Sequence, residues 1–379
     1  MKLRNLHIVL FSILLLTVNC KEEIALKNDY NPILIVEGKI TNEPGPYIIK
    51  ITQSRPLDDY GEIPYQNCIV TIHESSGISE DLIEIKPGIY ITKEDGMQSE
   101  IGNKYSISII SPEGKEYVSD YQELLEPIEI QSFYSELIYL ENLNFTPNGL
   151  PGHQFYADTK DSPNADNYFL WEMVESYQYT ADFELYSIFD GFVTLYTNLN
   201  ELPQYDNLYR CWKTENVHYI YTGETNTLNS NKITRQALHF VGTDTKKLME
   251  RYSVLLNQYT IEEDAFFYWR EIEKQISEKN SLAVSQPYNI PGNVINVNDP
   301  DETVCGFFTV ASINQKRIFV DKPRAPFYYE TCCIGCIKGP PPVIMGIYDG
   351  NSLTRTTESC IDCRSKGGAT VKPDFWIDK

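Results

Sequence analysis

The stretch ILIVEGKITNEPGPYIIKITQS, residues 33–54, contains two runs of mostly apolar side chains separated by a short segment with two prolines and a glycine. The first run is ILIVEGKI (33–40), the second is YIIKITQS (47–54), and TNEPGP (41–46) lies between them. Proline and glycine favour a turn, whereas alternating β-branched residues fit a pleated strand with one buried face. The stretch therefore predicts a β-hairpin near the start of the folded region.

The same pattern continues downstream, in CIVTIHES (68–75), LIEIKPGIYIT (82–92) and KYSISIISPEGKEYVSD (104–120). Tyr105, Ile107 and Ile109 alternate with serines, as in a strand that has one buried and one solvated face. About seven short strands, with turn residues about every ten positions, are typical of a β-sandwich. We therefore expect an immunoglobulin-like or transthyretin-like sandwich over residues 28–125.

We expect residues 126–379 to form a larger β-rich domain that ends in a cysteine-rich tail. Long runs rich in aromatic residues, such as NYFLWEMVESYQYT (167–180), favour strands, as does a composition with 27 tyrosines and 5 methionines. The predicted fold class is therefore mainly β, with a sandwich followed by this second domain.

One segment of the second domain has a helical period. Thr260 and Glu263 have the spacing of a capping box, and the next apolar residues recur at intervals of four, three and four: Ala265, Trp269, Ile272 and Ile276. This pattern predicts a single clear helix over about 261–278. We expect its apolar side to pack on a sheet rather than to bind a partner.

The first 19 residues have the layout of a signal peptide, with Lys2 and Arg4 before an uncharged run over residues 8–18. The run has eleven residues, which is well short of the roughly 20 that a membrane-spanning helix needs. It ends near Cys20 and resembles the lipobox of bacterial lipoproteins, although Thr17, Val18 and Asn19 depart from that pattern. We expect the Cys20 thiol to carry a covalent lipid, and residues 20–27 to form a tether; the alternative is ordinary secretion with a free thiol.

The residues after Cys20 are Lys21, Glu22 and Glu23. They resemble the signal that directs Bacteroidota-type lipoproteins to the outer face of the outer membrane, although they also suit the solvated start of a tether. Without residues 1–19, the chain has 30 basic and 53 acidic residues, a net charge of −23. This charge disfavours nucleic acids and anionic membrane surfaces as partners, so we expect membrane attachment only through the lipid.

Nine cysteines occur in the chain, and an exported protein meets an oxidising compartment that favours disulfides. Cys68 and Cys305 lie in strand-like runs, and we expect both to be free and buried. Six further cysteines are disulfide candidates, enough for three bridges, and we expect one bridge to connect the tail to Cys211: Cys211, Cys332, Cys333, Cys336, Cys360 and Cys363. The alternative is a zinc site, because 333–336 and 360–363 are both Cys-x-x-Cys pairs.

Sequence motifs for catalysis are absent: there is no HExxH, no G-x-S-x-G and no phosphate-binding glycine loop. Asp299, Asp301 and Glu302 could bind calcium, but they lack the EF-hand spacing, and we expect them to be solvated loop acids. We therefore expect no enzymatic activity, no metal site and no cofactor apart from the lipid on Cys20.

Three stretches together resemble one family of Bacteroidota outer-membrane lipoproteins, grouped as domain of unknown function 4249: ILIVEGKITN (33–42), the region from AFFYWREIEKQIS to YNIPGNVINVNDPDETVCGFFTVAS (265–312) and CIDCRSKGGATVKPDFW (360–376). Members of that family are typically found beside TonB-dependent outer-membrane receptors. The resemblance implies location and neighbourhood more than activity: a lipid-anchored protein on the cell exterior, beside such a β-barrel. Our first hypothesis is that the protein docks on that barrel and assists ligand capture or complex assembly. The alternative is a stand-alone binder of a glycan or peptide. A docking protein should have an exposed apolar patch, and a ligand-binding protein a concave pocket with a few polar groups.

Overall fold

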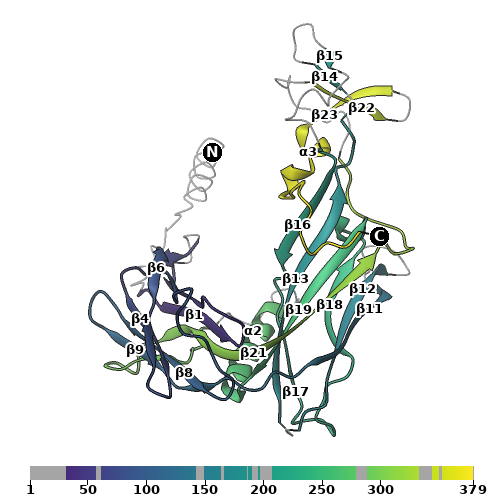
Figure 1. Ribbon diagram of the computed structural model, residues 1–379. Coiled ribbons are helices and arrows are strands. Elements are labelled where there is room, and N and C mark those ends of the chain that lie inside the picture. The colour runs from purple at the N-terminus through teal and green to yellow at the C-terminus, as the bar shows by residue number, and fades with distance from the viewer. Residues whose placement is uncertain are drawn as a thin grey trace, which may run out of the picture.

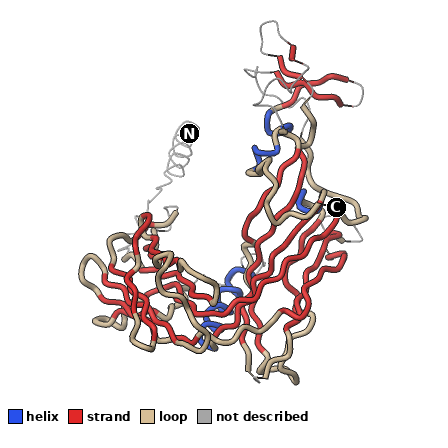
Figure 2. The backbone as a smooth tube through the Cα atoms, viewed as in Figure 1, coloured by secondary structure: helices blue, strands red, loops and turns tan. Residues whose placement is uncertain are grey.

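The computed structural model describes residues 31–56, 61–141, 149–163, 166–185, 187–189, 195–196, 207–278, 288–332, 344–349 and 352–378. Within these ranges the fold is mainly β, as expected, and strands dominate the backbone trace (Figure 2). The helical segments are α2 (Glu263–Glu278), α3 (Glu358–Ile361) and two 3₁₀ turns, η3 (Lys246–Leu248) and η4 (Cys363–Lys366). None of the described helices has the length and apolar character needed to cross a membrane.

The predicted hairpin is present as β1 (Leu34–Thr41) and β2 (Ile48–Gln53), which pair antiparallel from Leu34 opposite Gln53 to Gly38 opposite Ile49. Alternate residues of both strands, Val36 and Ile40 in β1 and Ile49 and Ile51 in β2, are completely buried. The alternation in the sequence therefore corresponds to one face that packs in a core, as predicted.

The hairpin belongs to a β-sandwich, also as predicted, which forms the lobe at the lower left of Figure 1. One layer is the end of a long sheet, in which β3 (Ile63–Pro64) and β7 (Ile89–Ile91) pair with β2, and β6 (Ile83–Lys86) pairs with β7. The other layer is a six-stranded sheet in the order β20 (Val294–Asn296), β9 (Glu116–Ser119), β8 (Lys104–Ile110), β4 (Ile69–Glu74) and β5 (Ser79–Asp81), with β10 (Gln122–Glu123) beside β8. We call the cluster between these layers the first core.

The first core is not confined to residues 28–125, because residues from far along the chain complete it: Val294, Val304, Phe308 and Val310. Three of them lie in β21 (Val304–Asp321), which pairs in parallel with β1 from Leu34 opposite Val304 to Thr41 opposite Ala311. Gly306 in β21 has a φ of 83°, and a Cβ atom there would collide with the carbonyl oxygen of Val36. Glycine therefore permits the close approach of the two strands.

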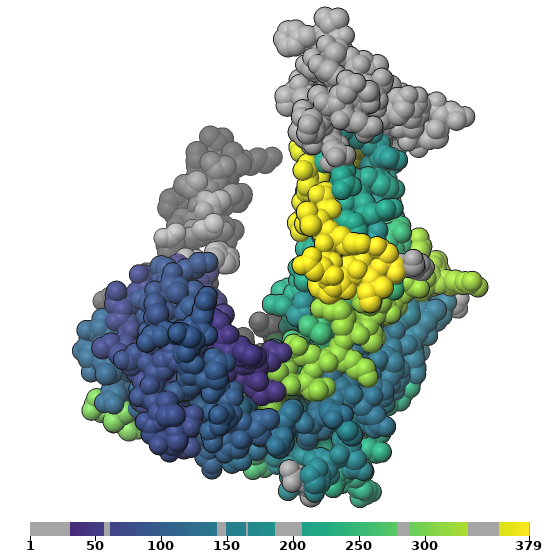
Figure 3. Space-filling view, viewed as in Figure 1, coloured from purple at the N-terminus to yellow at the C-terminus, as the bar shows by residue number. Residues whose placement is uncertain are grey.

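The same strand continues into a second core. Beyond Ala311, β21 pairs antiparallel with β19 (Arg251–Ile261), so the sheet runs on through β13 (Tyr168–Thr180) to β16 (Arg210–Asn216), with β17 (Tyr221–Glu224) also beside β13. A three-stranded sheet covers it: β11 (Ile130–Leu140), β12 (Leu150–Thr159) and β18 (Gln236–Gly242). Figure 3 shows the resulting notch between two lobes, with the earliest strands in purple meeting the light green of β21 at its base.

The second core lies between these two sheets and contains Phe155, Trp171, Cys211 and Leu256. A further small sheet consists of β15 (Leu195–Tyr196), β14 (Ser187–Phe189), β22 (Ile344–Asp349) and β23 (Ser352–Thr356), at the top of Figure 1. The C-terminal tail lies along the long sheet, because Ala369 forms a bridge with Trp212 and the ring of Trp376 packs edge-on against Phe319.

The predicted helix is α2, but it begins at Glu263 rather than at 261, and the predicted capping box is wrong. Thr260 is the penultimate residue of β19, and its hydroxyl accepts a hydrogen bond from the Ile128 backbone N–H at 3.2 Å. The strand continues this far because residues up to Ile261 are buried between the sheet and its neighbours. The first helical hydrogen bond runs from the Phe266 N–H to the Glu262 carbonyl. The apolar side of the helix packs on the sheet, as expected.

Candidate functional site

The predicted attachment residues lie outside the part of the chain that the structure describes. These are the acylation site Cys20 and the export signal Lys21, Glu22 and Glu23, together with the signal peptide over residues 1–19 and the tether over 20–27. Their assignments remain predictions.

Two disulfides involve the cysteine-rich tail, one that connects it to β16 and one within the tail itself. Cys211, which we expected to receive one bridge, pairs with Cys363, and Cys332 pairs with Cys360. The Cα atoms are 5.7 Å apart in each pair, a normal disulfide separation. Cys333 and Cys336 lie outside the described residues. Because Cys360 and Cys363 are both oxidised, they cannot supply the thiolates that the alternative zinc site requires.

Cys68 and Cys305 are free, as expected, but both are half-buried rather than buried. Cys68 lies one residue before β4 begins, and its side chain packs against the margin of the first core, where it is only partly covered. Burial raises the pKa of the Cys68 thiol to about 11 and also raises the pKa of Cys305. Neither thiol is therefore a ready nucleophile at neutral pH.

The three loop acids that we expected to be solvated differ in their exposure to solvent. Asp299 and Asp301 are exposed, but Glu302 is turned inward and holds its loop against β9. Its carboxylate accepts hydrogen bonds from the Lys115 ammonium at 3.0 Å and the Tyr117 hydroxyl at 3.1 Å. The expectation that Glu302 is solvated was wrong, because Lys115 supplies a cationic partner. The same contacts occupy the oxygens that a calcium ion would need.

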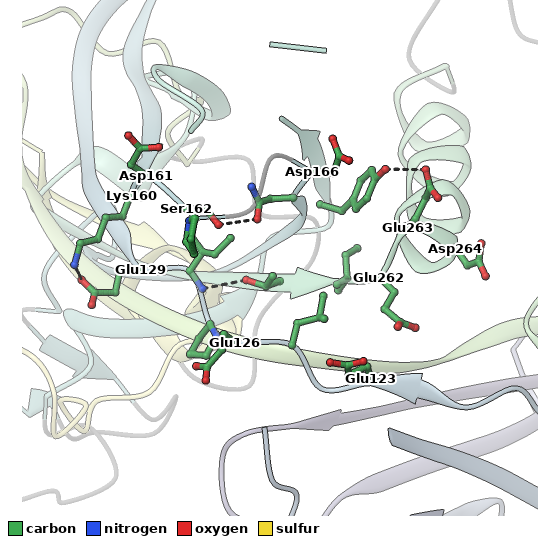
Figure 4. A pocket seen from close by; sticks show the side chains of 18 residues that line it. Glu123, Glu126, Glu129, Lys160, Asp161, Ser162, Asp166, Glu262, Glu263 and Asp264 are labelled. Carbon is green, nitrogen blue, oxygen red and sulfur yellow. Dashed lines mark hydrogen bonds and ion pairs between the residues drawn. The ribbon is translucent and has the colours of Figure 1, made fainter. Parts of the chain in front are cut away.

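A broad cleft of about 860 Å³ lies where the chain passes from the first core to the second (Figure 4). Four segments line it: Glu123 and the linker 125–129 between β10 and β11, residues 160–163 after β12, residues 166–168 at the start of β13, and residues 260–264 where β19 leads into α2. All four are ends of regular elements. The two rigid cores therefore fix the shape of the cleft.

The cleft is strongly acidic. Eight carboxylate side chains line it, against a single lysine: Glu123, Glu126, Glu129, Asp161, Asp166, Glu262, Glu263, Asp264 and Lys160. The ammonium of Lys160 is 2.9 Å from Glu129, so the lysine neutralises one of these carboxylates only. Figure 4 shows Lys160, Asp161 and Glu129 on one side and Glu262, Glu263 and Asp264 on the other. Clustered charges of one sign in a concave site raise the local concentration of oppositely charged molecules.

Glu262 shows the electrostatic consequence of this crowding. Burial raises the pKa of its carboxyl group, and the negative charges of Glu123 and Asp264 raise it further. Glu123 has a partial counter-charge in Lys104, whose ammonium is 3.7 Å away. A cation bound between these groups would relieve the repulsion and lower the pKa of Glu262 again.

Polar and apolar groups around the carboxylates give the cleft a defined wall. The Tyr168 hydroxyl donates to Glu263 at 2.7 Å, and the buried Ser162 hydroxyl donates to Asn167 at 2.9 Å. Apolar surface comes from linker and loop residues: Leu125, Pro127, Ile128 and Pro163. Neither histidine nor cysteine is among the residues that line the cleft. The arrangement suits a ligand that has positive charge and some apolar surface.

Sequence reasoning did not find this cleft. The only signals were short acidic clusters at the ends of predicted strands, in EPIE (126–129), KDSPNAD (160–166) and EED (262–264). Nothing in the sequence indicates that these three clusters converge in space, because the convergence depends on the pairing of β11 with β12 and of β13 with β19.

Comparison with known proteins gives a family and no function. A search of curated proteins found no match. A family model described as "Domain of unknown function (DUF4249)" matches residues 21–317, which includes β1, most of β21 and every residue of the acidic cleft. The chain therefore belongs to the DUF4249 family.

Proposed function

We propose that this protein is a non-enzymatic, lipid-anchored protein of the outer-membrane surface that captures a cationic ligand for a TonB-dependent outer-membrane transporter. The observation that carries the capture role is the acidic cleft, in which one lysine faces eight carboxylates. The anchor on Cys20, the exposed location and the transporter partner rest on the N-terminal sequence and on the resemblance described above.

The chemical class of ligand follows from the cleft. Its volume of about 860 Å³ exceeds what a single metal ion requires and suits a molecule of drug size or a short peptide. The carboxylates on opposite walls favour a ligand with more than one positive charge, such as a basic peptide or a polyamine. The apolar linker between the walls would contact its hydrocarbon part.

Capture can be tested by calorimetric titration of the purified protein with trilysine and, for comparison, with triglutamate. The cleft variant is Glu126→Gln, Asp161→Asn and Asp264→Asn, three exposed side chains whose neutralisation leaves both cores intact. The matched control is Glu94→Gln, Asp95→Asn and Glu100→Gln, which removes the same charge from an exposed surface of the first lobe.

We expect trilysine to bind, and the cleft variant to weaken binding by about tenfold to a hundredfold, since each lost charge pair contributes about 0.5 to 1 kcal/mol. The control variant should lower the affinity by less than about twofold at 0.15 M salt, because screening limits long-range charge effects. Equal losses in the two variants would show that only the net charge matters and would refute a cleft-specific role.

The transporter partnership requires a separate experiment. Tagged protein is purified from gently solubilised outer membranes, and the proteins that elute with it are identified and quantified by mass spectrometry. A TonB-dependent barrel in a one-to-one ratio supports the accessory role. Elution without a barrel would favour the alternative of a stand-alone surface binder of a glycan or peptide.

A further inference from the structure

The six-stranded sheet of the first lobe has an unusual outer face. Its inner face packs in the first core, so its outer face would ordinarily be polar. Instead, the register places Ile69 of β4 directly opposite Ile110 of β8, and Val118 of β9 directly opposite Ile295 of β20. In Figure 1 the strands β4, β8 and β9 lie on the side of this lobe that faces away from β13 and β16.

These side chains form two neighbouring rows across the sheet. One row contains Ile69, Ile110 and Glu116, and the next contains Thr71, Ser108, Val118 and Ile295. Val297 continues the first row, because its N–H donates to the Glu116 carbonyl. Ile69, Ile110, Ile295 and Val297 are 57%, 41%, 52% and 47% exposed. We call the set Ile69, Ile110, Val118, Ile295 and Val297 the isoleucine face.

Single exposed apolar residues are normal, but a contiguous group in register marks a site of interaction. The cleft lies elsewhere, since none of these residues lines it. The isoleucine face is therefore a second surface that the capture of a ligand does not explain.

The rim of the isoleucine face is acidic. Glu116 lies within the rows, Asp81 is opposite Thr71, and Asp299 and Asp301 follow Val297 in the next loop. The nearest lysine in the sequence, Lys115, is already paired with Glu302. The face is therefore an apolar surface that has one carboxylate inside it, Glu116, and others along its rim.

This charge pattern indicates which kind of partner could bind to the isoleucine face. A second copy would bring two acidic rims together, and an anionic membrane surface would repel the same carboxylates. A protein surface with an apolar centre and a rim of lysine or arginine is complementary in both respects. We propose that the isoleucine face is the docking surface for such a protein, and that this protein is the transporter of the proposed function, on which the assignment rests.

The test uses two matched triple variants in the purification from outer membranes. The face variant is Ile69→Thr, Ile110→Thr and Ile295→Thr. The control variant is Ile78→Thr, Ile101→Thr and Ile377→Thr, whose isoleucines are 58%, 40% and 60% exposed but lie apart from one another and outside the named strands. Threonine keeps the β-branched shape, so both variants should retain the fold. Melting temperatures within about 2 °C of the unmodified protein would verify this.

We expect the face variant to reduce the ratio of barrel to bait by at least about tenfold, because residues at the centre of an interface supply most of its binding energy. The control variant should leave the ratio unchanged. A third variant, Glu116→Lys, changes one exposed side chain and reverses the charge that lies within the face. It should reduce the ratio by at least about threefold at 0.05 M salt and by less at 0.5 M.

Two outcomes distinguish the failure of this assignment from the failure of the proposed function. If the unmodified protein brings down a barrel and the face variant brings down as much, the docking surface is elsewhere, while the accessory role stands. If the unmodified protein brings down no barrel, the accessory role fails, and the docking assignment fails with it. Trilysine binding by the face variant should equal that of the unmodified protein, because the two surfaces are separate.

Discussion

The bridge between Cys211 and Cys363 should be the larger contributor to stability of the two described disulfides. It closes a loop with a sequence separation of 152 residues, whereas Cys332–Cys360 closes one of 28. The chain-entropy relation gives about 5 kcal/mol for the longer loop and about 3.5 kcal/mol for the shorter one. Both values are upper estimates, because residual structure in the unfolded chain reduces the gain.

The perturbation is a pair of double variants, Cys211→Ala with Cys363→Ala, and Cys332→Ala with Cys360→Ala. Alanine avoids a buried hydroxyl at Cys211 and Cys363, which are 0% and 1% exposed. Urea unfolding can be followed by the fluorescence of the four tryptophans, one of which, Trp171, lies in the same core as Cys211. We expect the first variant to lose more free energy of unfolding than the second, by about 1.5 kcal/mol. An equal or smaller loss would refute the argument from loop entropy.

Three further variants test the charge, the core and the anchor. Burial raises the pKa of Glu262, so its protonated form favours folding at low pH, and this contribution is lost as the pH rises through the folded-state pKa. Glu262→Gln should therefore raise the melting temperature at pH 7 and leave it unchanged at pH 3; a decrease at pH 7 would contradict the assignment. Phe308→Ala should lower the free energy of unfolding by about 3 to 5 kcal/mol in calorimetry, because the ring is fully buried in the first core; a loss below about 1 kcal/mol would contradict it. Cys20→Ser should release the protein from membranes during a carbonate wash, and a variant that still sediments would show that the anchor is elsewhere.

The local part of the fold could be predicted from the sequence. The hairpin over 33–54 and the helix near 261–278 follow from residue periodicity, which reflects contacts between near neighbours in the chain. The error at Thr260 has the same origin. Its spacing from Glu263 is that of a capping box, but burial of the preceding residues between two layers extends β19 to Ile261.

The long-range part could not be predicted. Strand β1 pairs in parallel with a segment about 270 residues later, and no periodic pattern in either strand specifies that partner. The first core therefore extends beyond the domain boundary expected at residue 125, because it includes residues from β20 and β21. The acidic cleft depends on other long-range pairings, β11 with β12 and β13 with β19, which bring the acidic residues at 126–129, 161, 166 and 262–264 into one place. The isoleucine face could not be predicted either, because only the register of the strand pairing shows which isoleucines are neighbours.

The position of β1 also determines how the protein resists a pulling force. The strand is hydrogen-bonded on both sides, to β2 and to β21, and it is the first strand after the predicted tether. Tension along the strand from its N-terminal end would load both ladders in shear at the same time. An edge strand pulled sideways would instead unzip one hydrogen-bonded pair after another. The chain thus leaves the fold at a mechanically strong point, which would suit the proposed anchorage through Cys20.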